Sequence, residues 1–203
     1  MLAVDEKGNI VDGDQVMAII GNEMKKNGTL KKDTIVGTVM SNLGFTLMGK
    51  EYGIHIEQTK VGDRYVLENM RENGYNIGGE QSGHIIFLDE NTTGDGLLSA
   101  LHLLEVIVKT KKPLSELASI MEVLPQALVN AKVPNHKKEK FMDYPEIAQA
   151  VHDLENKFAG EGRVLIRPSG TEPLVRVMIE GKNQEEISKD AQSLADLIMR
   201  NVL

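Results

Sequence analysis

The sequence contains no cysteine, so the chain forms no disulfide bond and offers no thiolate ligand to a metal ion. It also lacks a basic excess, because 23 lysine and arginine residues against 30 aspartate and glutamate residues leave a net charge of -7. Proteins that bind the nucleic-acid backbone usually carry a basic surface stripe. The composition therefore argues against a nucleic-acid partner.

Long apolar runs are missing as well. No run is long enough to span a bilayer, and the first residues do not combine a basic flank with an apolar core as a signal peptide does. We therefore expect a soluble, cytoplasmic protein without a membrane partner.

Hydrophobic residues make up 41% of the 203 residues, enough for one large core or two ordinary ones, and we expect two domains that meet near Leu124. In the first domain a strand-like start and turn are followed by alternating elements. The helical patterns lie at 14–27, 41–52, 65–73, 97–108 and 114–121, and the strand patterns at 34–40, 54–59 and 85–88. This alternation predicts a three-layer α/β domain with a mostly parallel sheet, whose ligands bind beyond the carboxyl ends of the strands.

The remainder of the chain has a different pattern. Strands are predicted at 127–133, 163–167 and 174–179, a charged loop at 136–140, and helices at 144–158 and 184–202. This order predicts a smaller α+β domain with an antiparallel sheet.

One polar motif interrupts the apolar pattern of the first domain. Between residues 78 and 84, three glycines accompany the carboxylate of Glu80, the amide of Gln81, the hydroxyl of Ser82 and the imidazole of His84. Glycines allow a close approach of backbone to ligand, and these side chains are suited to binding sugar hydroxyls. The alternative is a glycine-rich bulge with a surface histidine. Lys60 also follows a predicted strand, and it either faces a negatively charged substrate or is simply solvated.

A second polar motif joins the last two predicted strands. Ser169, Gly170 and Thr171 supply hydroxyls and backbone N–H groups, and Arg167 and Arg176 supply forked cations, a combination suited to a phosphate group. The alternative is an ordinary hairpin loop whose hydroxyls bind their own backbone.

As a pair, Gly79-Glu80-Gln81-Ser82-Gly83-His84 and Arg167-Pro168-Ser169-Gly170-Thr171-Glu172-Pro173 resemble motifs of the α-D-phosphohexomutase family. The stretches 59–65 and 93–96 fit the same family, so the resemblance covers essentially the whole chain. It is most similar to the phosphoglucosamine mutase branch, because members that act on mannose or glucose phosphates often have methionine at the position of Gln81.

The resemblance implies four domains in the parent enzyme, with a phosphorylated serine in the first and a magnesium loop ending the second. Residues 1–11 resemble the tail of the second domain, 12–124 the sugar-binding third, and 125–203 the phosphate-binding fourth, which has a TATA-binding-protein-like fold. Mg²⁺ would be bound by residues absent from this chain, which has no metal site of its own. The amino-terminal half would be a partner, and a homodimer is possible.

The implied activity is the interconversion of glucosamine 6-phosphate and glucosamine 1-phosphate through a 1,6-bisphosphate, on the way to UDP-N-acetylglucosamine and cell-wall precursors. The alternatives are a phosphomannomutase or phosphoglucomutase fragment and a non-catalytic phosphosugar-binding module. By resemblance His84 and Lys60 are catalytic, with His84 moving a proton and Lys60 supplying charge. The residues expected to bind substrate are Glu80, Gln81, Ser82, Arg167, Ser169, Gly170, Thr171 and Arg176.

Overall fold

The computed structural model describes residues 1–202 and separates them into two compact units. The first unit is Met1–Val123, and the second begins at Leu124. Among the helices formed by residues 1–202, none is long and apolar enough to cross a membrane.

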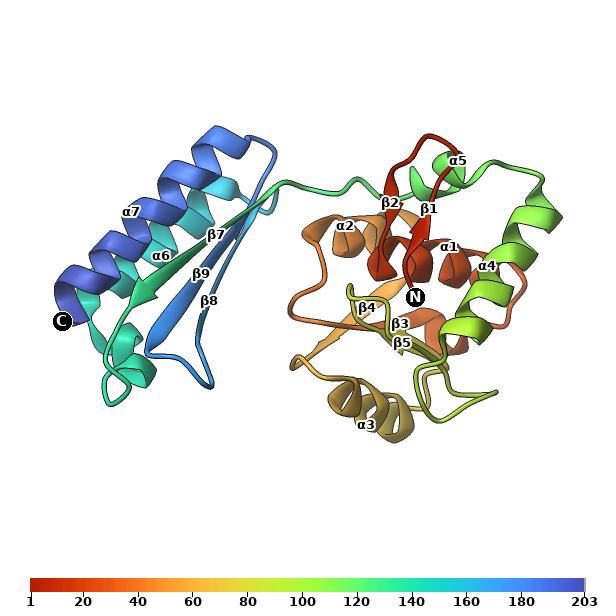
Figure 1. Cartoon of the computed structure of the whole chain (residues 1–203), viewed down its shortest axis with the longest axis horizontal. Helices are drawn as coiled ribbons and strands as arrows, with labels where there is room; N and C mark the ends of the chain where they lie inside the picture. Colours follow the sequence, from red (N-terminus) through yellow and green to blue (C-terminus); the bar gives the residue numbers. More distant parts are fainter. Residues whose placement is uncertain (203) are drawn as a thin grey trace. The chain divides into compact units, whose positions relative to one another are not determined.

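The first unit is built on a four-stranded sheet of order β4-β3-β5-β6, in which β3 runs parallel to β4 and β5 while β6 runs antiparallel to β5. Neighbouring residues of a strand face opposite sides of the sheet. Ile35 accordingly packs in the core that contains Met17 of α1, whereas Val36 packs against Met70 of α3 on the other side. Figure 1 shows α3 on one side of the sheet and α1 and α2 on the other, so the predicted three layers are confirmed.

The elements of this unit, in chain order, are β1 (Ala3–Val4), β2 (Ile10–Val11), α1 (Gly13–Lys26), a 3-10 turn (Lys31–Asp33), β3 (Thr34–Thr38), α2 (Leu43–Tyr52), β4 (His55–Thr59), α3 (Asp63–Asn73), β5 (Ile77–Gly79), β6 (Ile85–Phe87), α4 (Gly96–Thr110) and α5 (Leu114–Ala118).

Capping residues set the boundaries of these helices. The side chains of Asp12, Asn42 and Asp95 each accept a backbone N–H at the start of α1, α2 and α4. At the other end, α2 and α3 stop at Gly53 and Gly74, which adopt the left-handed conformation common after helices. The predicted ends of these helices therefore agree with the structure.

The second unit contains a three-stranded sheet that is antiparallel, as predicted, and has the strand order β7-β9-β8. Val175, Val177 and Ile179 on one face of β9 are fully buried in the same core as Ile187 and Leu194 of α7. Figure 1 shows α6 and α7 together on one side of this sheet, which leaves the opposite face without a helix. The elements are β7 (Gln126–Lys132), a 3-10 helix η2 (Lys138–Asp143), α6 (Pro145–Phe158), β8 (Arg163–Pro168), β9 (Leu174–Glu180) and α7 (Gln184–Val202).

The segment predicted as a charged loop at 136–140 differs from the prediction. It enters η2, because the Pro134 carbonyl accepts the backbone N–H groups of Lys137 and Lys138, and Phe141 is buried in the core of the second unit. Two further boundaries were overextended. The strand predicted at 34–40 is β3, which ends at Thr38, whose hydroxyl accepts the Met40 N–H. The helix predicted at 114–121 is α5, which stops at Ala118.

Candidate functional site

Two polar loops of the first unit meet at one edge of the sheet. Lys60 directly follows β4 and Glu80 directly follows β5, and both strands run parallel to β3, so their carboxyl ends lie at the same edge. The loops are joined there, because the backbone N–H of Gly62 donates a 3.0 Å hydrogen bond to Glu80 Oε1. Ligands of such sheets collect at this edge.

The loop from Glu80 to His84 is a tight turn that depends on Gly83. The Gly83 N–H donates to the Glu80 carbonyl, and the Glu80 N–H donates to the His84 carbonyl, each at 2.9 Å. Gly83 has φ +96°, which L side chains rarely adopt, and a Cβ there would lie 2.1 Å from the carbonyl oxygen of Met1. The turn is therefore fixed both by backbone conformation and by the segment packed against it.

Three side chains of this loop converge. His84 Nδ1 lies 3.5 Å from Ser82 Oγ and 3.9 Å from Glu80 Oε2. Glu80 is mostly covered, with 15% of its side chain exposed, whereas 66% of the His84 side chain is exposed. A covered carboxylate beside an exposed hydroxyl and imidazole can accept and donate hydrogen bonds to one polar ligand.

Gln81, which is also predicted to bind substrate, contacts the start of helix α1. Its Nε2 donates to Asp12 Oδ2 at 3.2 Å, and its carbonyl accepts the Gly13 N–H at 2.9 Å. A Cβ at Gly13 would lie 2.2 Å from the Glu80 carbonyl oxygen, so the helix start and the loop are in close contact. Sequence reasoning missed the supporting roles of Asp12, Gly13 and Gly62, although Asp12 precedes an apolar helical pattern, as capping residues do.

Lys60 is exposed and pairs with no carboxylate among residues 1–202. The preceding residue is fixed, because the Thr59 hydroxyl lies 3.2 Å from the Gly37 carbonyl and 3.0 Å from the Lys60 carbonyl. The backbone at Lys60 is thus held at the sheet edge while the ammonium group is solvated, and both roles considered for it stay open.

In the second unit, the residues of the predicted phosphate motif line one hollow of about 130 Å³. The lining residues are Arg167, Pro168, Ser169, Gly170, Thr171 and Arg176. The backbone N–H groups of Gly170 and Thr171, both exposed, have no hydrogen-bond acceptor within residues 1–202. Two free N–H groups and two guanidinium groups therefore lie around one small hollow.

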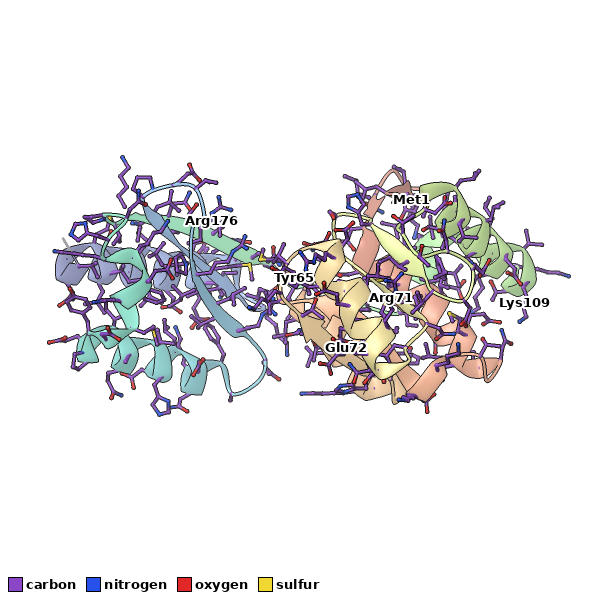
Figure 2. All side chains as sticks on the ribbon, turned by 90° about the horizontal axis from the view of Figure 1, so that it is seen from below. Met1, Tyr65, Arg71, Glu72, Lys109 and Arg176 are labelled. Carbon is purple, nitrogen blue, oxygen red and sulfur yellow. The ribbon has the colours of Figure 1, made fainter. Side chains whose placement is uncertain are left out.

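The strand register places the two arginines of this hollow directly opposite each other, as Arg167 on β8 pairs with Arg176 on β9. Like charges opposite each other on a sheet are unfavourable by roughly 0.2–1 kcal/mol. Only Arg176 has a carboxylate partner within the described chain, since its Nη2 lies 3.1 Å from Glu172 Oε2 at an exposed position. Figure 2 labels Arg176 on the sheet of this unit.

Another arginine of the same sheet is paired with a buried carboxylate. Four residues along β8, Arg163 pairs in register with Glu180, which is completely buried. Arg163 Nε donates to Glu180 Oε2 at 2.6 Å, and Gln126 Nε2 donates to Glu180 Oε1 at 2.6 Å. Compared with this cross-strand pair of opposite charges, the cross-strand pair of Arg167 and Arg176 has an excess of positive charge.

Ser169 itself is buried, with 5% exposed, and its hydroxyl accepts the Glu172 N–H at 3.1 Å. This bond is of the kind expected for the alternative, an ordinary hairpin loop whose hydroxyl binds its own backbone. The hydroxyl hydrogen is not used by it and can still be donated.

The described residues hold no cluster of three or more His, Asp or Glu that could bind a metal ion. The chain's own residues 1–202 thus do not fit the Mg²⁺ expected of the parent enzyme, and no step involving that ion is assigned to them.

Comparison with known proteins gives matches over both units. Residues 12–124 match the model for "Phosphoglucomutase/phosphomannomutase, alpha/beta/alpha domain III", and residues 128–197 match the model for the C-terminal domain of the same family. A phosphoglucosamine mutase of Acetivibrio thermocellus is 63% identical over 98% of this chain, and one of Caldanaerobacter subterraneus subsp. tengcongensis is 59% identical over all of it. The chain spans 44% and 45% of the length of these two relatives.

Solved structures agree on the fold. The N-acetylphosphoglucosamine mutase of Aspergillus fumigatus aligns with a TM-score of 0.76 and 20% identity, covering 99% of this chain and 46% of that one. The same enzyme in complex with GlcNAc-6P and magnesium aligns with a TM-score of 0.73 and 20% identity, over 97% of this chain and 49% of that one. The chain therefore belongs to the phosphoglucomutase/phosphomannomutase family, of which it contains the third and the C-terminal domains.

Proposed function

We propose that the chain is the sugar-reading and phosphate-holding part of an enzyme that interconverts glucosamine 6-phosphate and glucosamine 1-phosphate through a bisphosphate. The observation that carries the proposal is the paired Arg167 and Arg176 beside two free backbone N–H groups. Two guanidinium groups held opposite each other lose their repulsion when a dianion lies between them. The relatives at 58–63% identity are named phosphoglucosamine mutase, which favours an amino sugar as substrate.

In this proposal the two loops divide the work. The Glu80 carboxylate accepts hydrogen bonds from sugar hydroxyls, and the Ser82 hydroxyl accepts from them or donates to them. The hollow of the second unit holds the phosphate that is not being transferred. Phosphoryl transfer depends on positioning and charge neutralisation more than on covalent chemistry, so fixing both ends of the substrate supplies much of the catalysis.

His84 is the candidate for moving a proton at the reacting hydroxyl, because it is exposed next to Ser82 and Glu80 and its imidazole has one nitrogen that can accept a proton and one that can donate one. Lys60 would contribute charge at the same sheet edge. Gln81 would act by holding the loop on α1, and its direct contact with substrate remains a prediction.

The finer expectations belong to the same proposal. The amino-terminal half of the parent enzyme would supply the phosphorylated serine and the Mg²⁺. The parent enzyme would act in the cytoplasm as a homodimer, and its product would be used in cell-wall precursor synthesis. The magnesium complex of the Aspergillus fumigatus enzyme supports a role for the ion in the family.

Calorimetric titration of the chain with glucosamine 6-phosphate tests the phosphate hollow. Arg167→Ala should weaken binding by about 1.5–3 kcal/mol, a factor of roughly 10 to 150, because a charge-assisted hydrogen bond is lost. Arg200→Ala, which removes an exposed arginine from α7, is the matched control and should bind like wild type. Equal affinity of Arg167→Ala and wild type would remove the hollow from the proposal.

Mixing the chain with a separately produced amino-terminal half of a close relative tests catalysis. Turnover of glucosamine 6-phosphate should appear in the mixture and should be lost with His84→Ala. If sugar phosphate binds but turnover never appears with the intact chain, the chain is a phosphosugar-binding module and the enzymatic assignment is wrong.

A further inference from the structure

A buried lysine lies beneath the proposed phosphate loop. Lys138 is the first residue of η2, and 9% of it is exposed. Its ammonium group donates hydrogen bonds to the carbonyl oxygens of Ser169 and, at 3.4 Å, Glu172. These two carbonyls lie on either side of Gly170 and Thr171, so one side chain holds both ends of the loop's exposed tip.

The charge of this lysine is not balanced within the fold. A buried ammonium group is normally paired with a carboxylate, because removing it from water is expensive. Among residues 1–202, no carboxylate lies within ion-pair distance of Lys138. In contrast, the ammonium group of Lys157 has carboxylate oxygens of both Glu186 and Asp190 within 2.8 Å.

The orientation of one peptide unit links Lys138 to the ligand side of the loop. The Ser169 carbonyl and the Gly170 N–H belong to the same planar trans peptide, so they point in opposite directions. Holding the Ser169 carbonyl on Lys138 therefore directs the Gly170 N–H away from Lys138. Gly170 is exposed and a Cβ there would meet nothing within 4 Å, so few other contacts hold this peptide.

We propose that Lys138 is a positioning residue of the phosphate loop, which fixes the Ser169–Gly170 peptide so that the Gly170 N–H faces the phosphate and adds a third positive charge behind Arg167 and Arg176. Without the lysine, this peptide is free to rotate, and the rotated form turns a carbonyl oxygen instead of an N–H toward the anion. The inference rests on the proposed phosphate-binding role of the loop.

The test uses the 203-residue chain with glucosamine 6-phosphate as the probe and inorganic phosphate as a second one. Lys138→Met, which keeps the length of the side chain but removes the charge and the donors, should bind both probes about tenfold more weakly, equivalent to about 1.4 kcal/mol. Lys138→Arg should recover most of the affinity. Lys140→Met removes an exposed charge two residues away and should bind like wild type.

A purely structural role is distinguished by a local readout. In wild type the Gly170 amide resonance should shift on addition of phosphate, whereas in Lys138→Met that shift should be strongly reduced. Glu180→Gln, which weakens the same unit at the other end of the sheet, should leave both affinity and the Gly170 response unchanged. Should Lys138→Met fail to fold, Lys138→Gln, which keeps a donor on a shorter side chain, makes the same test.

The outcomes separate the two proposals. If wild type binds neither probe, the proposed function fails. If wild type binds and folded Lys138→Met binds within a factor of about two, with a normal Gly170 response, the positioning role of Lys138 is overturned while the proposed function stands.

Discussion

The buried ion pair between Arg163 and Glu180 should be a principal determinant of the stability of the second unit. Glu180 is completely buried and accepts hydrogen bonds from Arg163 and from Gln126, so it connects the outer strands β8 and β7 to the central strand β9. Glu180→Ala leaves the Arg163 guanidinium, 18% exposed, without its charge partner. Removing one member of a buried pair costs about 3–5 kcal/mol, which is a large part of the stability of a small domain.

The expected loss is measurable by amide hydrogen exchange, which reports each unit separately. The slowest-exchanging amides of β9 should lose about 3 kcal/mol or more of opening free energy in Glu180→Ala. Those of α1 in the first unit should not change, which provides an internal control. Glu161→Ala is the matched control variant, because it removes a pair with Lys182 whose side chains are 72% and 58% exposed, and exposed pairs contribute little.

A double variant checks the reasoning behind the magnitude. If the large loss arises from an uncompensated charge, then replacing both Arg163 and Glu180 by methionine should destabilise less than Glu180→Ala alone, since no buried charge is left. A loss below about 1 kcal/mol in Glu180→Ala, or a larger loss in the double variant, would refute this account.

Two further predictions concern the first unit. Gly83→Ala should destabilise it by about 1–3 kcal/mol more than Gly8→Ala, because both glycines have positive φ, +96° and +87°, but only at Gly83 does a Cβ collide with the backbone of Met1. Urea unfolding followed by circular dichroism measures the difference, and equal losses would contradict it. The Lys31 ammonium and the Asn76 amide hold the pKa of Asp89 below its ordinary value, so the ionised carboxylate stabilises the fold above the ordinary carboxylate pKa, and this contribution is lost as the pH falls below about 4. Because the side chain is half exposed, Asp89→Asn should cost only a few tenths of a kcal/mol at pH 7 and less at pH 3, and an equal cost at both would be inconsistent with this linkage.

Much of the fold follows from local patterns. The buried alternation at Val175, Val177 and Ile179 predicts a strand, and the glycines at positions 53 and 74 predict the helix ends that the structure shows. These signals are local, because side-chain periodicity and capping depend on neighbours within a few residues. Where the outcome depends on distant partners, the prediction failed. Phe141 draws the expected charged loop into η2 by packing into a core formed by residues far along the chain.

The candidate site shows the same division. Residue types identified Glu80, Ser82 and His84 as members of one polar loop, but nothing in the sequence indicates that Gln81, between them, would turn toward Asp12. Its direction is set by contact with Asp12 at the start of α1, 69 positions away in the chain. Lys138 was missed for a similar reason, because a lysine in a charged stretch gives no local sign of burial.

The register of β8 against β9 converts two unremarkable arginines into a potential anion site. On sequence alone, Arg167 and Arg176 are nine positions apart and could have faced different neighbours, since slipping the pairing by one residue would move Arg176 to the helix-covered face. The register is fixed instead by the core residues Val175 and Val177, which must remain under α7. The apolar core therefore maintains an electrostatically unfavourable arrangement on the opposite face of the sheet. An anion bound between the two arginines relieves this repulsion, which is the physical reason to look for a phosphate there.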